Sequence, residues 1–447
     1  MKQPEILIVV FVVFGFFPRA VFSYSVLTHQ EIIDLAWNDS IRPLLLARYP
    51  NATESELRVA HAYAYGGSAI QDMGYYPFGK QLFSDLTHYV RSGDFVAYLF
   101  RDARNIDEYA FAIGALSHYV GDSIGHSEAI NPSTAAAFPR LEKKYGSSVT
   151  YDESPHGHIR TEFAFDIDEL ANREFAPHAY QDAVGFRVPR KLLERAFFDT
   201  YGIDAHEILG RAHPALRSYR ASVRSFIPAF AEAELVLHGH QFPPHPEDQA
   251  YRVFAERVER TNYERHWKHA FRGPGIRDHL LAILVFIIPK IGPASDLAIK
   301  IPTSESQEWY LKSVNHTVDI YRDRLDKLRK GPGTALSLTN LDLDTGEITR
   351  PGSYPLTDKT YADLLNRIVE KTDRILPPLL KRNILEYYSN AAAPIETKHD
   401  RKAWSKVVAE LEMLRKMKVG APEDWLEHEL ATDVQIPLSS LHKSQGD

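Results

Sequence analysis

Residue types that bind metals recur at intervals of four in one segment of this chain, as His118, Asp122 and His126. On an α-helix, residues four apart differ by only ~40° in direction and rise ~6 Å along the axis, so these side chains form one stripe about 12 Å long. Zinc bonds to imidazole and carboxylate run ~2.0–2.2 Å, so a single ion reaches neighbours on the stripe but hardly both end histidines. The spacing therefore predicts a helix that holds two or more metal ions, or a helix that bends.

Further residues of the same types lie nearby in the sequence. His158 and Glu162 repeat the four-residue step on a second expected helix, and Asp72 and His88 lie upstream. A single helical histidine is more often a core or surface residue than a ligand, but the combination favours a metal cluster, because facing helices of a bundle commonly build such sites. The chain has no cysteine. Any zinc must then be held by His, Asp, Glu or backbone groups, which favours a catalytic over a structural zinc site.

The pattern of apolar residues predicts an all-α, multi-helix bundle. Apolar residues recur at the helical period through most of the chain, and alternating, strand-like patterns are almost absent. The expected helices cover Glu31–Ala47, Glu54–Ala69, Gln81–Phe100, Asn105–Gly125, Arg160–Ala176, Pro189–Thr200, Ala205–Leu209, Arg217–Leu237, Gln249–Lys268, Gln307–Lys330, Lys359–Thr372 and Arg401–Lys418.

A break rich in proline and polar residues, from His238 to Pro246, predicts a domain boundary. It separates residues 24–245, which carry the metal-type residues, from a helical C-terminal region, 246–447, whose role the sequence does not indicate. We interpret His238, His240 and His245 as parts of a solvated linker, with weak metal binding as the alternative. The apolar run Leu280–Ile288 is expected to be a buried helix, with docking on a membrane as the alternative.

The first residues of the chain predict export. An apolar run, Ile6–Phe17, follows Lys2, and residues 1–23 have the pattern of a signal peptide cleaved after Ser23, with cleavage after Ala20 as the alternative. We therefore expect a secreted or periplasmic protein. The formal net charge of −7 is spread over mixed signs and gives no basic field of the kind that gathers nucleic acid.

An ordered set of motifs resembles the zinc-dependent phospholipases C and the fungal single-strand-specific nucleases, which share an all-α fold with three zinc ions. The resemblance covers roughly Tyr24–Leu237. The motifs that carry it are Tyr24-Ser25-Val26-Leu27-Thr28-His29, Gln71-Asp72 before Thr87-His88, His118-Tyr119-Val120-Gly121-Asp122, and His158-Ile159-Arg160-Thr161-Glu162.

The resemblance implies three zinc sites. One would be held by Asp72, His88, His118 and Asp122, and a second by His126, His158 and Glu162. The third would use the amine and carbonyl of Tyr24, as the first residue after signal cleavage, together with His29 and Asp122. An α-amine with a pKa of ~7.7–8.0 binds zinc when it is free and deprotonated, so cleavage after Ser23 would create a ligand. Two features depart from the family: it usually begins with tryptophan, and the interval from Asp122 to His126 is shorter than usual.

The implied activity is hydrolysis of a phosphodiester by metal-activated water, with Asp72 as the general base or as a group that orients the water. The expected substrate is a phospholipid, with contact to a membrane surface, and the products include a phosphorylated head group. The alternatives are a nuclease or another phosphoesterase on the same site, and a non-catalytic metal-binding envelope protein. No protein partner is inferred. The aromatic residues near Asp72 in the sequence could bind a quaternary ammonium group, stack on a nucleobase or belong to the core; they are Tyr63, Tyr65, Tyr75, Tyr76 and Phe78.

Overall fold

A computed structural model describes residues 26–210, 212–263, 299–331, 336–390 and 392–420 of the 447-residue chain. Within these ranges the chain forms helices and two isolated β-bridges, and no strand. The predicted all-α class is therefore confirmed. The predicted signal peptide, Tyr24 and the apolar run 280–288 lie outside the described residues. No helix in the described ranges is both long enough and apolar enough to cross a membrane.

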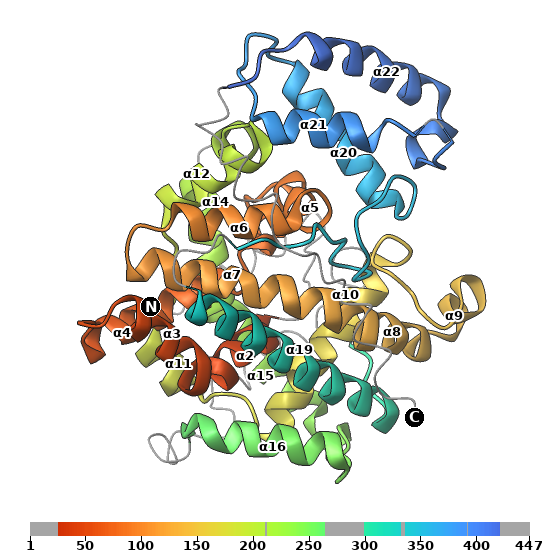
Figure 1. Cartoon of the computed structure of the whole chain (residues 1–447). Helices are drawn as coiled ribbons and strands as arrows, with labels where there is room; N and C mark the ends of the chain where they lie inside the picture. The colour runs from red at the N-terminus through yellow and green to blue at the C-terminus, as the bar shows by residue number, and fades with distance from the viewer. Residues whose placement is uncertain (1–25, 211, 264–298, 332–335, 391, 421–447) are drawn as a thin grey trace, which may run out of the picture.

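The first half of the chain is a bundle built around one long central helix, α7 (Figure 1). Its elements are α2 (Val26–Ala36), α3 (Arg42–Arg48), α4 (Glu54–Gly67), α5 (Gln81–Tyr89), α6 (Ser92–Asp102), α7 (Ile106–Gly125), α8 (Asn131–Ala137), α9 (Pro139–Tyr145), α10 (Pro155–Asn172), α11 (His178–Val184), α12 (Arg190–Tyr201), α13 (Ala205–Leu209), α14 (Ala212–Ala221) and α15 (Ile227–His238).

The remaining helices are α16 (Gln249–Thr261), α19 (Ser304–Lys330), α20 (Pro355–Val369), α21 (Pro378–Tyr387) and α22 (Arg401–Lys416). In Figure 1, α19 runs obliquely below α7, while α20, α21 and α22 form a layer at the top of the molecule. The Tyr321 hydroxyl on α19 donates to the Ile113 carbonyl of α7 at 2.9 Å. Helices from both sides of the predicted boundary after residue 245 thus pack together, and the boundary itself stays a prediction.

Local signals fix where the helices around the site begin. Thr53 and Glu56 form a reciprocal capping box at the start of α4. Asn105 caps α7 by accepting a hydrogen bond from the Glu108 backbone N–H at 2.9 Å. These caps satisfy backbone donors that the first turn of a helix leaves without a partner, and so they set the register of α4 and α7.

Helices α4 and α7 approach so closely that glycine is required where they meet. A Cβ added to Gly114 would lie 2.1 Å from the Ala64 carbonyl oxygen, and one added to Gly67 would lie 2.1 Å from the Phe111 carbonyl oxygen. The close approach brings Ser68, which follows α4, against the α7 residue His118. This contact places the first group of metal-type side chains.

Candidate metal centre

The first group of metal-type side chains comprises Asp72, His88, His118 and Asp122, all of them buried. Asp72 lies in a short 3-10 turn, Gln71–Tyr75, His88 lies near the end of α5, and the other two lie one turn apart on α7. One ligand atom of each residue lies within 4.8 Å of the others. The structure therefore brings together all four residues that the resemblance assigns to one zinc.

The two histidines of this group are oriented by backbone carbonyls. His118 Nδ1 lies 3.0 Å from the Ser68 carbonyl oxygen, and His88 Nδ1 lies 2.7 Å from the Ser84 carbonyl oxygen. A carbonyl only accepts, so each Nδ1 carries the proton and each Nε2 is directed into the group. Histidine ligands of metals are commonly held in this way, with the outer nitrogen bonded to a carbonyl or carboxylate.

Asp122 stands between three histidines. Its Oδ2 lies 3.0 Å from His118 Nε2 and 3.3 Å from His88 Nε2, while its Oδ1 lies 3.1 Å from His29 Nε2. Because its two oxygens face different imidazoles, Asp122 has the arrangement of a bridging carboxylate. His29 lies on α2, and its ring stacks on that of His118 with centroids 4.3 Å apart.

The start of α2 is held in place by Asp166 on α10. The Asp166 carboxylate accepts hydrogen bonds from the backbone N–H groups of Leu27 and Thr28, both at 3.2 Å, and from the Thr28 hydroxyl at 3.1 Å. These bonds position His29, the next residue. Tyr24, the other residue expected at the third site, lies outside the described residues.

The second group contains His126, His158 and Glu162. His158 and Glu162 lie one turn apart on α10, with His158 Nε2 2.9 Å from Glu162 Oε1, and His126 Nε2 lies 3.3 Å from the same oxygen. His126 is the first residue of a π-helical turn, His126–Ile130, that follows α7. The chain therefore changes from α-helical to π-helical geometry at His126, the last of the three residues spaced by four. The structure brings together the three residues expected at a second ion.

Asp344 is a fourth member of the second group that the sequence did not indicate. Its Oδ1 lies 3.5 Å from His126 Nδ1 and 3.9 Å from His158 Nε2. Its Oδ2 accepts from the Tyr151 backbone N–H at 3.0 Å and from the Tyr354 hydroxyl. Its loop also packs against the end of α7, because a Cβ on Gly346 (φ +72°) would lie 2.3 Å from the Ser123 carbonyl oxygen. Asp344 belongs to no spaced motif, so no sequence signal pointed to it.

Burial and mutual charge shift the pKa values of these residues. Burial lowers the pKa of His126 to about 4 and that of His158 well below its ordinary value, so both rings are neutral and offer a lone pair at pH 7. Burial would also lower the pKa of His88, but Asp122 and Asp72 raise it to about 10. Burial would raise the pKa of Asp122, but His118 and His126 hold it well below its ordinary value.

The donor atoms of both groups fit zinc. They are imidazole nitrogens and carboxylate oxygens, the ligands left to a chain without cysteine. Both oxygens of Asp72 and of Glu162 and both ring nitrogens of His158 are buried and make no well-aligned hydrogen bond in the described structure. Their close polar neighbours are other members of the two groups, as between His158 Nε2 and Glu162 Oε1 at 2.9 Å. Buried polar atoms are rarely left in that state, and convergence on a metal ion accounts for it.

Residues 28–210 match the family model of the zinc dependent phospholipase C. This region belongs to the zinc-dependent phospholipase C family. It includes every expected site residue except Tyr24, and it ends before Asp344. No curated protein and no solved structure matches the chain.

Tyrosine rings lie beside the site in the zinc-dependent phospholipase C region. The Tyr75 ring centroid is 5.8 Å from that of His88, and the Tyr151 ring centroid is 5.8 Å from that of His158. The two tyrosine rings are themselves 6.5 Å apart. In contrast, Tyr65 donates to Asp34 at 2.6 Å within the core, and Phe78 is exposed. Tyr75 and Tyr151, together with Tyr89 at 5.8 Å from the His88 ring, are therefore aromatic residues that pack beside the histidines of the two groups.

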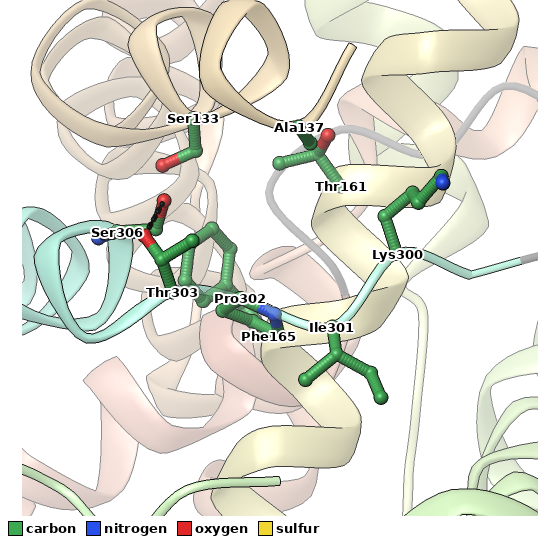
Figure 2. A pocket seen from close by; sticks show the side chains of 9 residues that line it. All are labelled: Ser133, Ala137, Thr161, Phe165, Lys300, Ile301, Pro302, Thr303 and Ser306. Atoms are coloured by element: carbon green, nitrogen blue, oxygen red, sulfur yellow. Dashed lines mark hydrogen bonds between the residues drawn. The ribbon is translucent and has the colours of Figure 1, made fainter. Parts of the chain in front are cut away.

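A separate small hollow lies between α8, α10 and the start of α19 (Figure 2). Figure 2 shows Thr303 and Ser306 joined by a hydrogen bond at its edge, at 3.2 Å. The hollow holds about 20 Å³, room for one water molecule, and no residue of either metal group lines it. It is too small for a phospholipid head group.

Proposed function

We propose that this protein is a zinc-dependent phosphodiester hydrolase that cleaves phospholipids as a phospholipase C does. The observation that carries the proposal is the position of Asp122, whose two oxygens lie 3.0–3.3 Å from His29, His88 and His118. A shared carboxylate between histidine groups holds metal ions near one another, the arrangement used for in-line displacement at phosphorus. The membership of residues 28–210 in the zinc-dependent phospholipase C family supports it.

Zinc would be held by Asp72, His88, His118 and Asp122 at one position and by His126, His158 and Glu162 at another, with Asp344 completing the second set. Bound zinc supplies Lewis-acid activation of water and neutralises charge on the phosphate. A third ion would use His29, Asp122 and the free amine of Tyr24. That part of the proposal depends on the predicted cleavage after Ser23 and on export from the cytoplasm.

In the proposed reaction, water adds to phosphorus and the bond from phosphorus to the glycerol oxygen breaks. The glycerol oxygen takes a proton, giving diacylglycerol and a phosphorylated head group. Asp72 would accept a proton from the attacking water or orient it, because its carboxylate is buried within the first group, with Oδ1 3.2 Å from His88 Nε2. Tyr75 and Tyr151 would cover the reacting group on the side of His88 and His158.

The test uses the mature protein purified from an exporting host, loaded with zinc, and vesicles of phosphatidylcholine, phosphatidylethanolamine or phosphatidylinositol. We expect release of diacylglycerol from at least one vesicle type and loss of that release in His118→Ala. The control is Lys312→Ala, which changes an exposed residue of α19. Nucleotide release from single-stranded DNA or RNA, without diacylglycerol, would overturn the lipid assignment in favour of a nuclease. No hydrolysis by a fully zinc-loaded protein would overturn the proposed activity.

A further inference from the structure

A second cluster of metal-type side chains lies outside the site described above. It contains Glu169 on α10, Glu174 just after that helix, and His245, which lies between α15 and α16. Glu169 follows Glu162 by seven residues on α10, which corresponds to about 10 Å along the helix axis. Asp166 lies between the two positions, and its carboxylate is already engaged by the start of α2. The cluster is therefore separate from the candidate metal centre.

The three side chains of this cluster converge on one point. One ligand atom of each lies within 4.8 Å of the others, and all three residues are buried. His245 Nδ1 lies 2.9 Å from Glu174 Oε2, and His245 Nε2 lies 4.0 Å from Glu169 Oε1. The His245 side chain is only 1% exposed, which excludes the solvated linker that the sequence had suggested.

His245 is oriented by Asp168. Its Nε2 lies at hydrogen-bond distance, 3.1 Å, from Asp168 Oδ2. Asp168 is itself fixed by the Gln307 amide, which donates to its two oxygens at 2.9 and 3.0 Å. The Nδ1 of His245 faces Glu174 in the same way. Burial would lower the pKa of His245, but the hydrogen bonds with Asp168 and Glu174 raise it to about 11, so an ion bound at Nδ1 would displace a proton. A carboxylate that binds the outer nitrogen of a histidine is the usual support of a metal-ligating imidazole.

The Glu169 carboxylate lacks a hydrogen-bond partner within the described structure. Both of its oxygens are buried without one, whereas His245 Nδ1 and Glu174 Oε2 lie 2.9 Å from each other. Both oxygens of Glu31, on α2, are also buried without a partner, and Glu31 lies close enough for its charge to interact with those of Glu174 and Glu169. With Asp168, four buried carboxylates are thus gathered around one imidazole, an arrangement that is costly unless a cation neutralises it.

We propose that Glu169, Glu174 and His245 hold a divalent transition-metal ion, with Glu31 as a neighbouring carboxylate that joins or supports the ligand set. An imidazole favours a transition metal over Ca²⁺ or Mg²⁺, while an excess of carboxylate oxygens suits Mn²⁺ as well as Zn²⁺. The ion fastens α2, α10 and the segment before α16 to one another. It lies apart from the proposed catalytic ions, so the inference does not depend on the proposed phospholipase activity.

The test counts metal ions bound to the full mature chain. Metal-free protein is equilibrated with Zn²⁺ alone or Mn²⁺ alone, freed of excess ion, and analysed for metal content. We expect the double variant Glu169→Gln/Glu174→Gln to bind about one ion per chain fewer than the unaltered protein. The matched control, Glu308→Gln on the exposed face of α19, should leave the count unchanged. His118→Ala should lose ions at the candidate metal centre and keep this one.

Thermal unfolding gives a second measurement. The unaltered protein and His118→Ala should both gain in Tm when the probe ion is added, and Glu169→Gln/Glu174→Gln should lose part of that gain. If the double variant does not fold, His245→Gln replaces it, with the same expected loss of one ion. Equal ion counts in the folded variant and the unaltered protein would overturn the inference, leaving a hydrogen-bonded His245 imidazolium among protonated glutamates. If the protein shows no phospholipase activity but the variant still binds one ion fewer, the proposed activity is wrong and this metal site is supported.

Discussion

His88 Nε2 and His118 Nε2 lie only 3.2 Å apart, although the Nδ1 of each ring is directed at a backbone carbonyl. If both rings were neutral, the two Nε2 lone pairs would face each other at this distance and repel. Either a proton or a metal ion must lie between them and the neighbouring carboxylates. Without a metal, Asp122 and Asp72 raise the pKa of His88 to about 10, which supplies that proton.

This relationship predicts that zinc displaces a proton when it binds. His88 is protonated at pH 7 in the metal-free protein, because its pKa is about 10, and the ion needs its lone pair. Zinc affinity should therefore fall as pH is lowered, by about tenfold per pH unit for this one proton. Calorimetric titration with zinc in buffers of different ionisation enthalpy measures the protons released. His88→Gln, which has no such proton, should release about one fewer; an equal release would contradict the assignment.

Asp344 provides a second prediction, because it reaches the His126 and His158 group from the C-terminal region. Asp344→Asn should weaken zinc binding or hydrolysis by about 10–100-fold, the range seen when a group that supports a metal ligand is removed. The matched control is Glu347→Gln, an exposed residue three positions away in the same loop. Asp342 is unsuitable as a control, because its carboxylate accepts from the Asp344 backbone N–H at 3.1 Å and so holds Asp344 in place. The control should leave the zinc count unchanged; equal zinc loss in both variants would contradict a specific role for Asp344.

The sequence predicted most helices from their apolar period and the pairs His118/Asp122 and His158/Glu162 from their four-residue spacing, whereas the assignment of Asp72, His88 and His29 came from the family resemblance. The expected helix Gln81–Phe100 is divided into α5 and α6. His118 and Asp122 share a face of α7 simply because they are four residues apart on a helix. Asp344 could not be predicted, since its place beside His126 depends on how a loop more than two hundred residues further along the chain folds back. The expectation that His245 is solvated was wrong for a related reason. Its proline-rich surroundings indicated a solvated linker, whereas packing against α10 buries it.

The close approach of α4 and α7 predicts a stability effect at Gly114. Gly114→Ala would force a Cβ to within 2.1 Å of the Ala64 carbonyl oxygen, a backbone atom that cannot move aside alone. We expect a loss of about 1–3 kcal/mol in the free energy of unfolding, measured with urea. The control is Gly121→Ala on the same helix, where the nearest atoms lie 3.4 Å from the added Cβ. There the better helix propensity of alanine should offset the contact, and an equal loss in both variants would contradict the packing argument.

The attachment of α13 to the segment before α21 predicts a pH dependence of stability. Arg374 donates two hydrogen bonds to the Glu207 carboxylate, both at 3.0 Å, and Lys371 lies 2.7 Å from it. The Arg374 hydrogen bonds, opposed by partial burial and aided by Lys371, lower the pKa of Glu207 to about 2. A carboxylate with a lowered folded-state pKa stabilises the fold above its unfolded pKa of about 4.3, and the contribution is lost as pH falls toward 2.

Urea unfolding of the metal-free protein at several pH values tests this dependence without interference from zinc loss. The unaltered protein should be more stable than Glu207→Gln at pH 7, and the difference should shrink steadily below about pH 4. Glu256→Gln, which changes an exposed glutamate of α16, serves as the control because Arg260 lies 4.0 Å from it across solvent. A difference that stays constant from pH 7 down to pH 2.5 would show that the Glu207 charge contributes nothing and that the variant acts through packing. The difference in stability is expected to disappear at low pH because acid neutralises Glu207 and leaves Arg374 without a charged partner. The pair is only partly exposed to water, so its attraction is not fully screened at pH 7.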